Sequence, residues 1–243
     1  MKKYLYILFL FFSVNCFAGG SRDYIPANSD NIDIGDRQDA STAITLMGWF
    51  YGDTQGGNQN ADIICKRASV GSQPYISYSL RYAGSSVNVN PSFNVGISGT
   101  LRTTGNNTHN ELVGQWAFYA GTWSTGNSLK FYLEGVLENE SSAFSGSITY
   151  NAYNVLLGRN ALDGVTLDGK AAYLQIHSSV LSSAQIAETM WKPGLVANGI
   201  YGFFPLWGSD ATEEDLSGKE YHGTVNGADE SSFGPPVFFM GGV

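Results

Sequence analysis

The sequence predicts an all-β protein, an antiparallel jelly-roll β-sandwich with one short helix near residues 182–190. Three observations support this prediction. Apolar and polar residues alternate through several short segments, turn-forming Gly, Asn and Ser residues separate those segments, and one late segment changes to helical spacing. Charged residues make up only 14% of the chain and 30 residues are glycine, which suits sheets joined by tight turns rather than a coiled coil or disorder.

The clearest predicted element is a hairpin that begins at Trp116. Alternation along its first strand places Trp116 and Trp123 on opposite faces. Residues 124–127 then supply small and amide side chains that tolerate a positive φ, and residues 129–134 alternate as the second strand. Glu134-Gly135 is the next tight turn, so the sequence predicts consecutive antiparallel strands.

Later segments continue this meander and end in the helix. Residues 154–159 and 171–176 are predicted strands joined by glycine-rich loops. From Leu181 onward the apolar residues follow helical spacing, and Ser182 or Ser183 can cap the amino-terminal end. A single helix therefore follows the last of these strands.

These segments resemble the laminin-G-like branch of the concanavalin A-like lectin/glucanase superfamily. The resemblance rests on Gln115-Trp116, Phe131-Tyr-Leu-Glu-Gly135, Leu157-Gly-Arg159, Gly169-Lys-Ala-Ala-Tyr-Leu-Gln-Ile-His177 and Leu181-Ser-Ser-Ala-Gln-Ile186. Upstream, residues 21–35 and 44–50 resemble the first strands of the family. The acidic pair that usually lies in the family's Gly-x-Ile-Asp-Glu-Val-Arg strand is Ala172-Tyr173 here, so that polar network is not expected.

Residues 202–227 resemble a segment that many relatives carry before those first strands, whereas here it comes last. Such a permutation changes little when the two ends of a sandwich lie side by side, as chain termini often do. The resemblance therefore covers nearly all of residues 19–243 and implies one jelly-roll domain.

Residues 1–18 are predicted to be a secretory signal peptide, with two lysines, an apolar core and a small-residue cleavage site ending at Ala18. Cys16 offers an alternative as a lipidated cysteine, which the polar residues before it disfavour. Residues 19–243 then form a single laminin-G-like domain, secreted to an extracellular or periplasmic location. No later segment has the ~20 apolar residues of a membrane span.

Net charge limits the expected partners, and the cysteine content limits the possible disulfides. The formal net charge is −8, and removal of residues 1–18 leaves 11 basic and 21 acidic residues, a net charge of −10. Nucleic acid is therefore not an expected partner. Cys65 is the only cysteine after Ala18, so the domain has no intramolecular disulfide, and alternation places Cys65 in a buried strand position rather than a reactive one.

An enzyme of this fold would require a pair of carboxylates, because glycoside hydrolysis uses two acids roughly 5 to 9 Å apart. Glu134, Glu138 and Glu140 come closest, but the turn at Gly135 separates the first from the others. The cluster Glu213-Glu-Asp215 is interpreted as surface charge. The three histidines lie in no nucleophile or metal-ligand spacing, so a noncatalytic domain without zinc is predicted.

Aromatic side chains are the candidate ligand contacts, because sugar rings stack on Trp and Tyr faces. Trp123, beside the predicted turn, is the first choice, followed by Tyr51 and Tyr201. For Trp123, a position at the edge of the core is an equally good interpretation. The tryptophans expected in the core are Trp49, Trp116 and Trp207.

Calcium is the candidate metal, because the resembled sandwiches often hold Ca²⁺ at a rim through oxygen ligands. The candidate ligands are Asp215, Asp163 and Asp168, each beside turn-forming residues. Asp-Gly is first of all a turn dipeptide, so a purely structural role for each remains the alternative.

Three functions follow from these observations. The leading hypothesis is a secreted noncatalytic domain that binds a polysaccharide, a surface glycan or a protein surface partner. The second is a structural module of a surface appendage or virion fibre, favoured by the apolar residues Phe238, Phe239 and Met240 near the end of the chain. The third, a polysaccharide hydrolase or lyase, requires an acid pair contributed by different strands.

Overall fold

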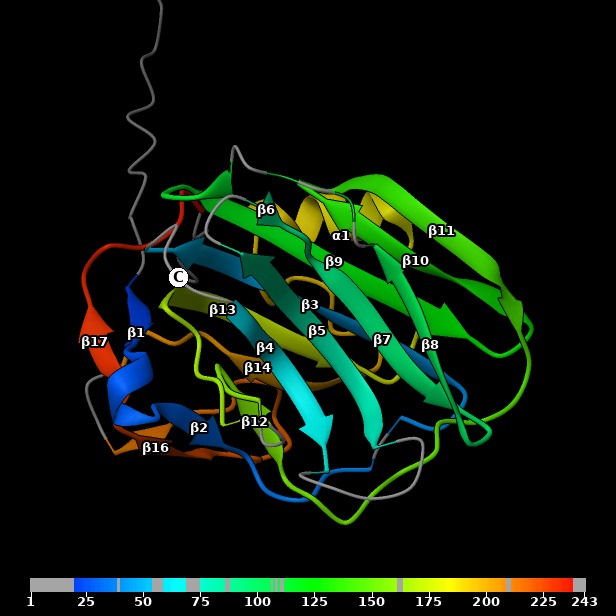
Figure 1. The fold of residues 1–243 in the computed structure, drawn as a ribbon, viewed down its shortest axis with the longest axis horizontal. Coiled ribbons are helices and arrows are strands. Elements are labelled where there is room, and N and C mark those ends of the chain that lie inside the picture. The colour runs from blue at the N-terminus through cyan, green and yellow to red at the C-terminus, as the bar shows by residue number, and fades with distance from the viewer. Residues whose placement is uncertain are drawn as a thin grey trace, which may run out of the picture.

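The computed structural model describes residues 20–38, 40–53, 59–68, 75–85, 88–105, 107, 109, 112–160, 164–208 and 211–237. These residues form two antiparallel sheets packed face to face, which confirms the predicted jelly-roll sandwich (Figure 1). The predicted signal peptide with Cys16, the ligand candidate Asp163, and Phe238, Phe239 and Met240 lie outside the described residues. Within the described part of the chain, no helix has the length and apolar character needed to cross a bilayer.

Sheet A contains the predicted hairpin. Its strands run in the order β11 (Val136–Phe144), β10 (Asn127–Leu133), β9 (Trp116–Ser124), β3 (Ala43–Gly52), β13 (Gly169–His177), β1 (Ser21–Tyr24) and β17 (Asp229–Ser231), and β14 (Ile200–Phe204) also pairs with β13.

Sheet B packs against one face of sheet A. Its order is β15 (Thr212–Glu213), β16 (Gly223–Asn226), β2 (Asn31–Asp33), β12 (Val155–Leu157), β4 (Gln59–Arg67), β5 (Ile76–Ser85), β7 (Ser92–Ile97) and β8 (Thr100–Gly105), with β6 (Asn88–Val89) on β5. A 3-10 helix, η1 (Pro26–Asn28), links β1 to β2, and the α-helix α1 (Ser183–Trp191) follows β13.

Both predicted turns are present. Gly126, with φ of +79°, connects β9 to β10, and Glu134 and Gly135, with φ of +51° and +74°, connect β10 to β11. A glutamate is a poor residue for this conformation, but here its carboxylate accepts a hydrogen bond from the Phe118 N–H at 2.6 Å. The side chain therefore anchors the turn to the adjacent strand β9.

The helix begins where its sequence predicts. Ser182 is the N-cap, and its hydroxyl accepts a hydrogen bond from the Gln185 N–H at 3.3 Å while the Gln185 side chain accepts one from the Ser182 N–H at 2.9 Å. Met190 is buried, and its carbonyl accepts a hydrogen bond from the indole of Trp49 at 3.0 Å. The cap and this contact fix α1 on sheet A.

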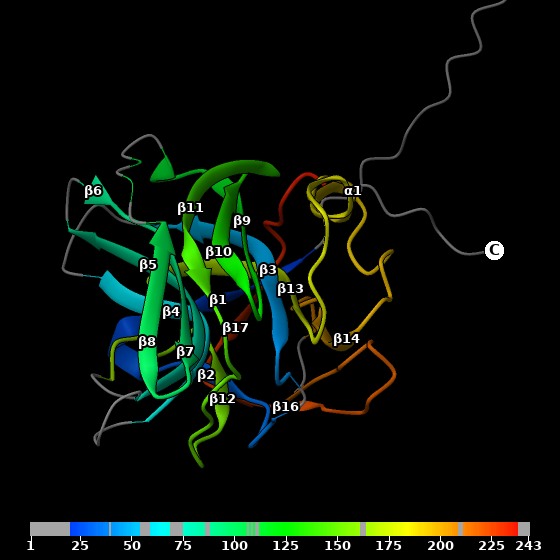
Figure 2. The same cartoon turned by 90° about the vertical axis from the view of Figure 1, so that its right-hand side faces the viewer.

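The central strands of sheet A are buried on both faces, and Figure 2 shows from the side that α1 lies over the face opposite sheet B. Tyr119 and Trp123 of β9 belong to the core between the two sheets. Phe118 and Ala120, on the alternate positions of the same strand, belong to a second core beneath α1, which Val237 near the end of the chain completes. The face that carries Trp116 is thus the outer face of sheet A, covered by the helix.

The two ends of the described chain meet. Strand β1 pairs with β17, and Arg22 Nε lies 3.1 Å from the Glu213 carboxylate with both side chains only 2% exposed. Glu213 also accepts a hydrogen bond from the Leu206 N–H at 2.7 Å, and burial raises the pKa of its carboxyl group. Glu213 and Asp215 are buried, so the prediction of surface charge was wrong for both.

We expect Glu213→Gln to lower the free energy of unfolding by about 3–5 kcal/mol, because the substitution leaves the Arg22 guanidinium buried without its counter-charge. Denaturant unfolding followed by circular dichroism measures this loss. Replacing both partners with apolar residues, Arg22→Met with Glu213→Leu, should recover much of it.

The matched control is Glu188→Gln, which breaks an exposed i,i+4 pair with Lys192 at 3.8 Å. We expect this change to cost under ~1 kcal/mol. Equal losses in the two variants would contradict the role assigned to the buried pair.

Candidate functional site

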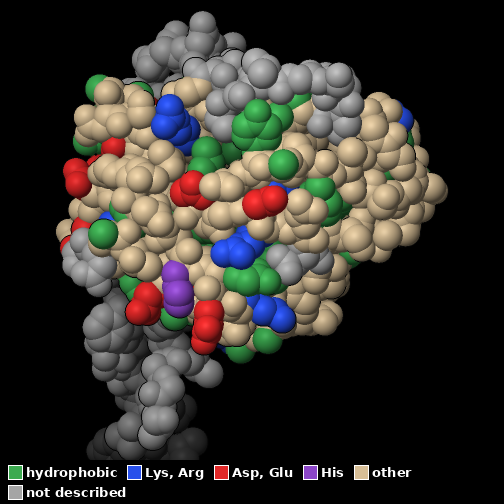
Figure 3. Space-filling model, turned by 90° about the horizontal axis from the view of Figure 1, so that it is seen from below, with side chains coloured by type: hydrophobic (Ala, Val, Ile, Leu, Met, Phe, Trp, Pro, Cys, Tyr) green, Lys and Arg blue, Asp and Glu red, His purple; other side chains and the backbone are tan. Residues whose placement is uncertain are grey.

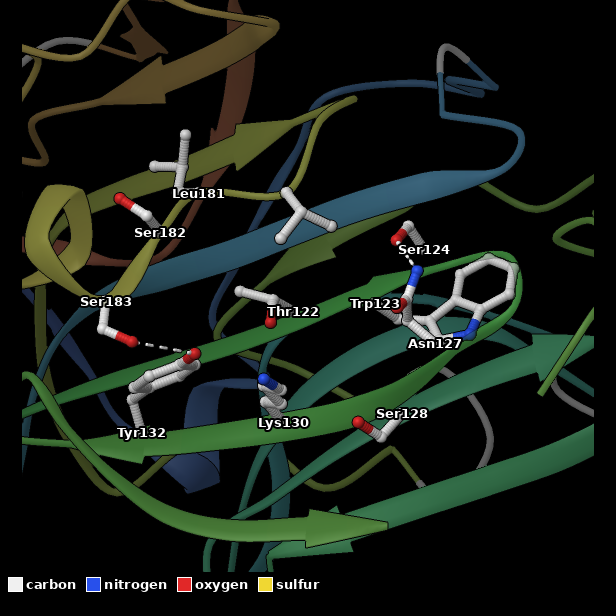
Figure 4. A pocket seen from close by; sticks show the side chains of 11 residues that line it. Thr122, Trp123, Ser124, Asn127, Ser128, Lys130, Tyr132, Leu181, Ser182 and Ser183 are labelled. Atoms are coloured by element: carbon white, nitrogen blue, oxygen red, sulfur yellow. Dashed lines mark hydrogen bonds between the residues drawn. The ribbon is translucent and has the colours of Figure 1, made fainter. Parts of the chain in front are cut away.

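The outer face of sheet A is uncovered beside the start of α1. There the end of β9, the start of β10 and residues 180–183 enclose a pocket of about 380 Å³, which we call the hairpin pocket (Figure 4). Small-molecule sites in proteins usually have volumes of roughly 300 to 1,000 Å³. The hairpin pocket is therefore large enough for one or two sugar units.

Hydroxyl groups dominate the lining of the hairpin pocket. They belong to Thr122, Ser124, Ser128, Tyr132, Ser182 and Ser183, and the other lining side chains include Asn127, Lys130, Val180 and Leu181. Residues two apart on a strand share a face, so β9 and β10 each present a polar row to the pocket. Figure 4 shows Lys130 on β10 between Ser128 and Tyr132, with Tyr132 opposite Ser183.

Hydrogen bonds hold the walls in place. The Thr45 hydroxyl donates to the Ser179 carbonyl at 2.7 Å and accepts from the Leu181 N–H at 3.1 Å, which ties residues 179–181 to β3. Across the pocket, the hydroxyls of Ser183 and Tyr132 lie 3.4 Å apart. The pocket is formed before any ligand enters.

Lys130 supplies the positive charge of the pocket. Its ammonium lies 3.7 Å from the Glu140 carboxylate, and both side chains are partly exposed, at 38% and 43%. An exposed pair of this kind contributes only ~0–1 kcal/mol, so a ligand oxygen could take the place of Glu140 at little cost. Glu140 itself is not among the residues that line the pocket.

The structure corrects two of the predicted ligand contacts. Trp123 is only 1% exposed, with its ring in the core between the sheets, although its position at the end of β9 lines the hairpin pocket. Tyr201 is 2% exposed, and its hydroxyl donates to that of Tyr78 at 3.4 Å. The alternating pattern of β9 correctly placed Trp123 and Trp116 on opposite faces of the strand, but the face that carries Trp123 packs against sheet B rather than meeting solvent. Trp207, expected in the core, is 40% exposed.

Tyr51 lies at the opposite end of the outer face of sheet A. Its ring is 5.7 Å from that of Trp116 and 5.1 Å from that of Phe233, and the ammonium of Lys170 lies 5.6 Å from its centre. Lys170 is bound in turn by the Asp53 carboxylate at 2.8 Å. Tyr51, Trp123 and Tyr201 therefore do not form one site, and the ligand role of Tyr51 stays a prediction.

Asp215 does not fit a calcium ligand, because its carboxylate is already occupied. The carboxylate accepts hydrogen bonds from the N–H groups of Phe203 at 2.9 Å, Ser217 at 2.9 Å and Tyr221 at 3.1 Å, and from the Ser217 hydroxyl at 2.7 Å. It organises the loop after β15. Among the described residues no group of three or more His, Cys, Asp and Glu could hold a metal. A calcium role for Asp168, which is half-buried, remains a prediction.

The outer face of sheet B contains a buried carboxylate that the sequence did not reveal. Asp62 is fully buried on β4, with Arg67 Nη1 3.5 Å from its Oδ2 and Arg81 opposite it on β5. Burial raises the pKa of Asp62 to about 6, although the two arginines act in the opposite direction. Cys65, on the same strand, is buried, as predicted, and its thiol donates to the Arg159 carbonyl at 3.1 Å.

Sequence reasoning missed the polar residues of the hairpin pocket. Lys130 alternates with buried Leu129 and Phe131, so its outward position could have been found from the strand period. Ser183 was considered only as a helix cap. Nothing in the sequence indicated that β13 and its following loop would bring Ser183 against Tyr132.

Comparison with known proteins agrees with the fold. Residues 26–187 match the concanavalin A-like lectin/glucanases superfamily, and the chain belongs to that superfamily. No curated protein matches the chain.

Three solved structures illustrate the likeness. A protein of Bacteroides ovatus ATCC 8483 that has been assigned to carbohydrate binding aligns with a TM-score of 0.68 and 14% identity, over 90% of this chain and 61% of its own length. The heptameric SAP-like pentraxin of Limulus polyphemus aligns with a TM-score of 0.60 and 12% identity, over 88% of this chain and 95% of its own. The enzymatically active domain of tailspike protein 2 from bacteriophage CBA120 aligns with a TM-score of 0.56 and 13% identity, over 76% of this chain and 29% of its own length. At these identities the likeness establishes the fold alone.

The buried carboxylate predicts a pH dependence of stability. The folded pKa of Asp62, about 6, lies above its ordinary value of 3.8, so the folded state retains a proton that the unfolded chain has lost between these values. The stabilisation from this group is complete below pH ~4 and is lost as the pH rises through about 6.

We therefore expect the stability of wild type relative to Asp62→Asn to fall between pH ~4 and ~6, by on the order of 3 kcal/mol, and to stay level above that range. Denaturant unfolding of both proteins at a series of pH values measures the difference. A difference that is constant with pH, or that rises across this window, would contradict the assignment.

Proposed function

We propose that this chain is a noncatalytic carbohydrate-binding domain, exported by means of residues 1–18, and that the hairpin pocket receives the saccharide. The observation that carries the proposal is the lining of this pocket, which combines six hydroxyl groups, an amide and a lysine with an apolar area of similar extent. The assignment of the Bacteroides protein of similar fold to carbohydrate binding supports the same class of ligand.

The chemistry of the lining suits a sugar. Each sugar hydroxyl both donates and accepts a hydrogen bond, and the Ser, Thr and Tyr hydroxyls of the pocket can do the same in either direction. The exposed side chain of Val180 offers apolar contact to the C–H face of a pyranose, while Tyr132 and Leu181 are almost fully buried beside the pocket. A solvent-exposed pocket with this lining favours selectivity for the arrangement of sugar hydroxyls over high binding affinity.

The same lining argues for binding rather than hydrolysis at this pocket. Glycosidases need two carboxyl groups, roughly 5 to 9 Å apart, on either side of the scissile bond. No carboxylate is among the residues that line the hairpin pocket, and the adjacent Glu140 interacts with Ser128 and Lys130.

Affinity electrophoresis of residues 19–243 in gels that contain laminarin, xylan, galactomannan or polygalacturonate tests the proposal. We expect retention by at least one polymer, and about a tenfold weaker affinity in Lys130→Ala, equal to ~1.4 kcal/mol, because that variant removes a charged hydrogen-bond donor from the pocket. Parallel gels with calcium and with chelator test whether a metal takes part.

The matched control is Lys192→Ala. Lys192 is 42% exposed in an ion pair at 3.8 Å, close to the 38% and 3.7 Å of Lys130, but it lies outside the hairpin pocket. Equal weakening in both variants would indicate a general charge effect and contradict the proposed location. If no polymer retains the wild type, a protein-contact role becomes the better hypothesis.

A further inference from the structure

A second hollow lies in sheet B, away from the hairpin pocket. It has a volume of about 300 Å³ and is lined by Asp33 at the end of β2 and by Ala152, Tyr153, Asn154 and Leu156 leading into β12. We call it the rim pocket. Strands β2, β12 and β16 lie low in Figure 1, and the face seen from below carries acidic and basic side chains intermixed, without a large patch of one sign (Figure 3).

The rim pocket combines an aromatic ring with a fixed polar pair. Tyr153 is 40% exposed although it is a large ring in a loop between strands. The Asn154 amide donates to Asp33 Oδ2 at 2.8 Å, and Asp33 Oδ1 accepts from the Gly35 N–H at 2.8 Å. The remaining lone pairs of the carboxylate and the amide oxygen stay open to a ligand, since each oxygen can accept more than one hydrogen bond.

A buried lysine holds the loop that carries these groups. The Lys66 side chain is fully buried, and its ammonium donates to the Asp36 carboxylate and to the Tyr153 carbonyl. Burial lowers the pKa of Lys66, which the hydrogen bond to Asp36 opposes. Burial of an ammonium costs several kcal/mol unless its partners are well placed, so this contact fixes the Tyr153 backbone strongly.

A second contact fixes the same loop from the other side. The Asn151 side chain accepts a hydrogen bond from the Tyr153 N–H at 3.1 Å, and the Asn151 N–H donates to the Ser77 hydroxyl of β5 at 3.1 Å. Tyr153 is thus held at both its N–H and its carbonyl, and the residue as a whole is 40% exposed. A ring presented in this way loses little conformational entropy when a ligand packs against it.

We propose that the rim pocket is a second saccharide contact, in which the Tyr153 ring packs against a sugar face while Asp33 and Asn154 hydrogen-bond its hydroxyls. The inference rests on the proposed function, because it assumes the same class of ligand. The Asp33 carboxylate disfavours acidic sugars, so the ligand is a neutral saccharide. The five-residue lining is too small for a stable protein interface, which buries about 800 Å² on each partner.

Titration calorimetry with short oligosaccharides of laminarin, xylan or galactomannan, using the polymer that retains the wild type, tests this inference. We expect two oligosaccharides per wild-type chain and one per chain for Tyr153→Ala. Tyr153→Phe should keep both, because it retains the ring. Trp207→Ala is the matched control, because Trp207 is also 40% exposed but lines neither pocket.

The intact polymer gives a second readout. Tyr153→Ala should weaken retention by the polymer on the order of tenfold or more, because two linked contacts reinforce each other when one chain engages both. Circular dichroism of each variant separates loss of binding from loss of fold.

The outcomes separate the two proposals. If the wild type binds one oligosaccharide per chain, and Lys130→Ala weakens this binding while Tyr153→Ala leaves it unchanged, the rim pocket is overturned and the proposed function is kept. If Tyr153→Ala instead abolishes this binding and Lys130→Ala leaves it unchanged, the rim pocket is kept and the hairpin pocket is rejected. No binding of any oligosaccharide or polymer would reject both.

Discussion

The burial of the central strands of sheet A on both faces is the constraint on which the rest of this structure depends. Sheet B covers one face, so Tyr119 and Trp123 are core residues. The other face would expose Phe118 and Ala120 unless another element covered it, and α1 with the chain near Val237 does so. Where that cover ends, beside the start of α1, the strand residues change to Thr122, Ser124, Ser128 and Lys130. The hairpin pocket is thus the place where an otherwise buried sheet face meets solvent, with rigid strands as its floor.

The same constraint explains why the last part of the chain is held so firmly. Strand β1 pairs with the first residues of β13 and β14 pairs with its last residues. Between these two stretches, the Tyr173 N–H donates a hydrogen bond to the Pro205 carbonyl. Arg22 and Glu213 then join the first strand to this returning segment in a fully desolvated pair. Such a pair contributes little over an apolar one, but loss of either partner leaves the other charge buried and uncompensated. The first strand and the final segment are therefore joined through two residues that depend on each other.

The parts of this fold that could be predicted are those set by local chemistry. Three predicted features depend on residues close together in the chain, and the structure confirms them. They are the two-residue alternation of the strands, the turns at Gly126 and Gly135, and the helix cap at Ser182. Trp123 and Tyr201 were misplaced because the period shows which residues share a face but not whether that face meets water or another layer. Glu213 was misread as surface charge because its partner Arg22 is 191 residues away. The lining of the hairpin pocket likewise depends on contacts between distant segments, such as Tyr132 with Ser183.

The chemistry of both pockets also bears on how this domain would bind. A hydroxyl of the pocket that binds a sugar gives up a hydrogen bond to water, so each contact gains only about 0.5–1.5 kcal/mol. Loss of translational and rotational freedom opposes this gain, by an amount of at least about 4 kcal/mol. Neither pocket offers a deep apolar enclosure that would compensate, since Val180 and Tyr153 are both about 40% exposed. One saccharide in one pocket is therefore held weakly. Two preformed pockets on different sheets overcome this limit only for a long or repeated glycan, which makes a polymer or a glycan-covered surface a better ligand than a free sugar.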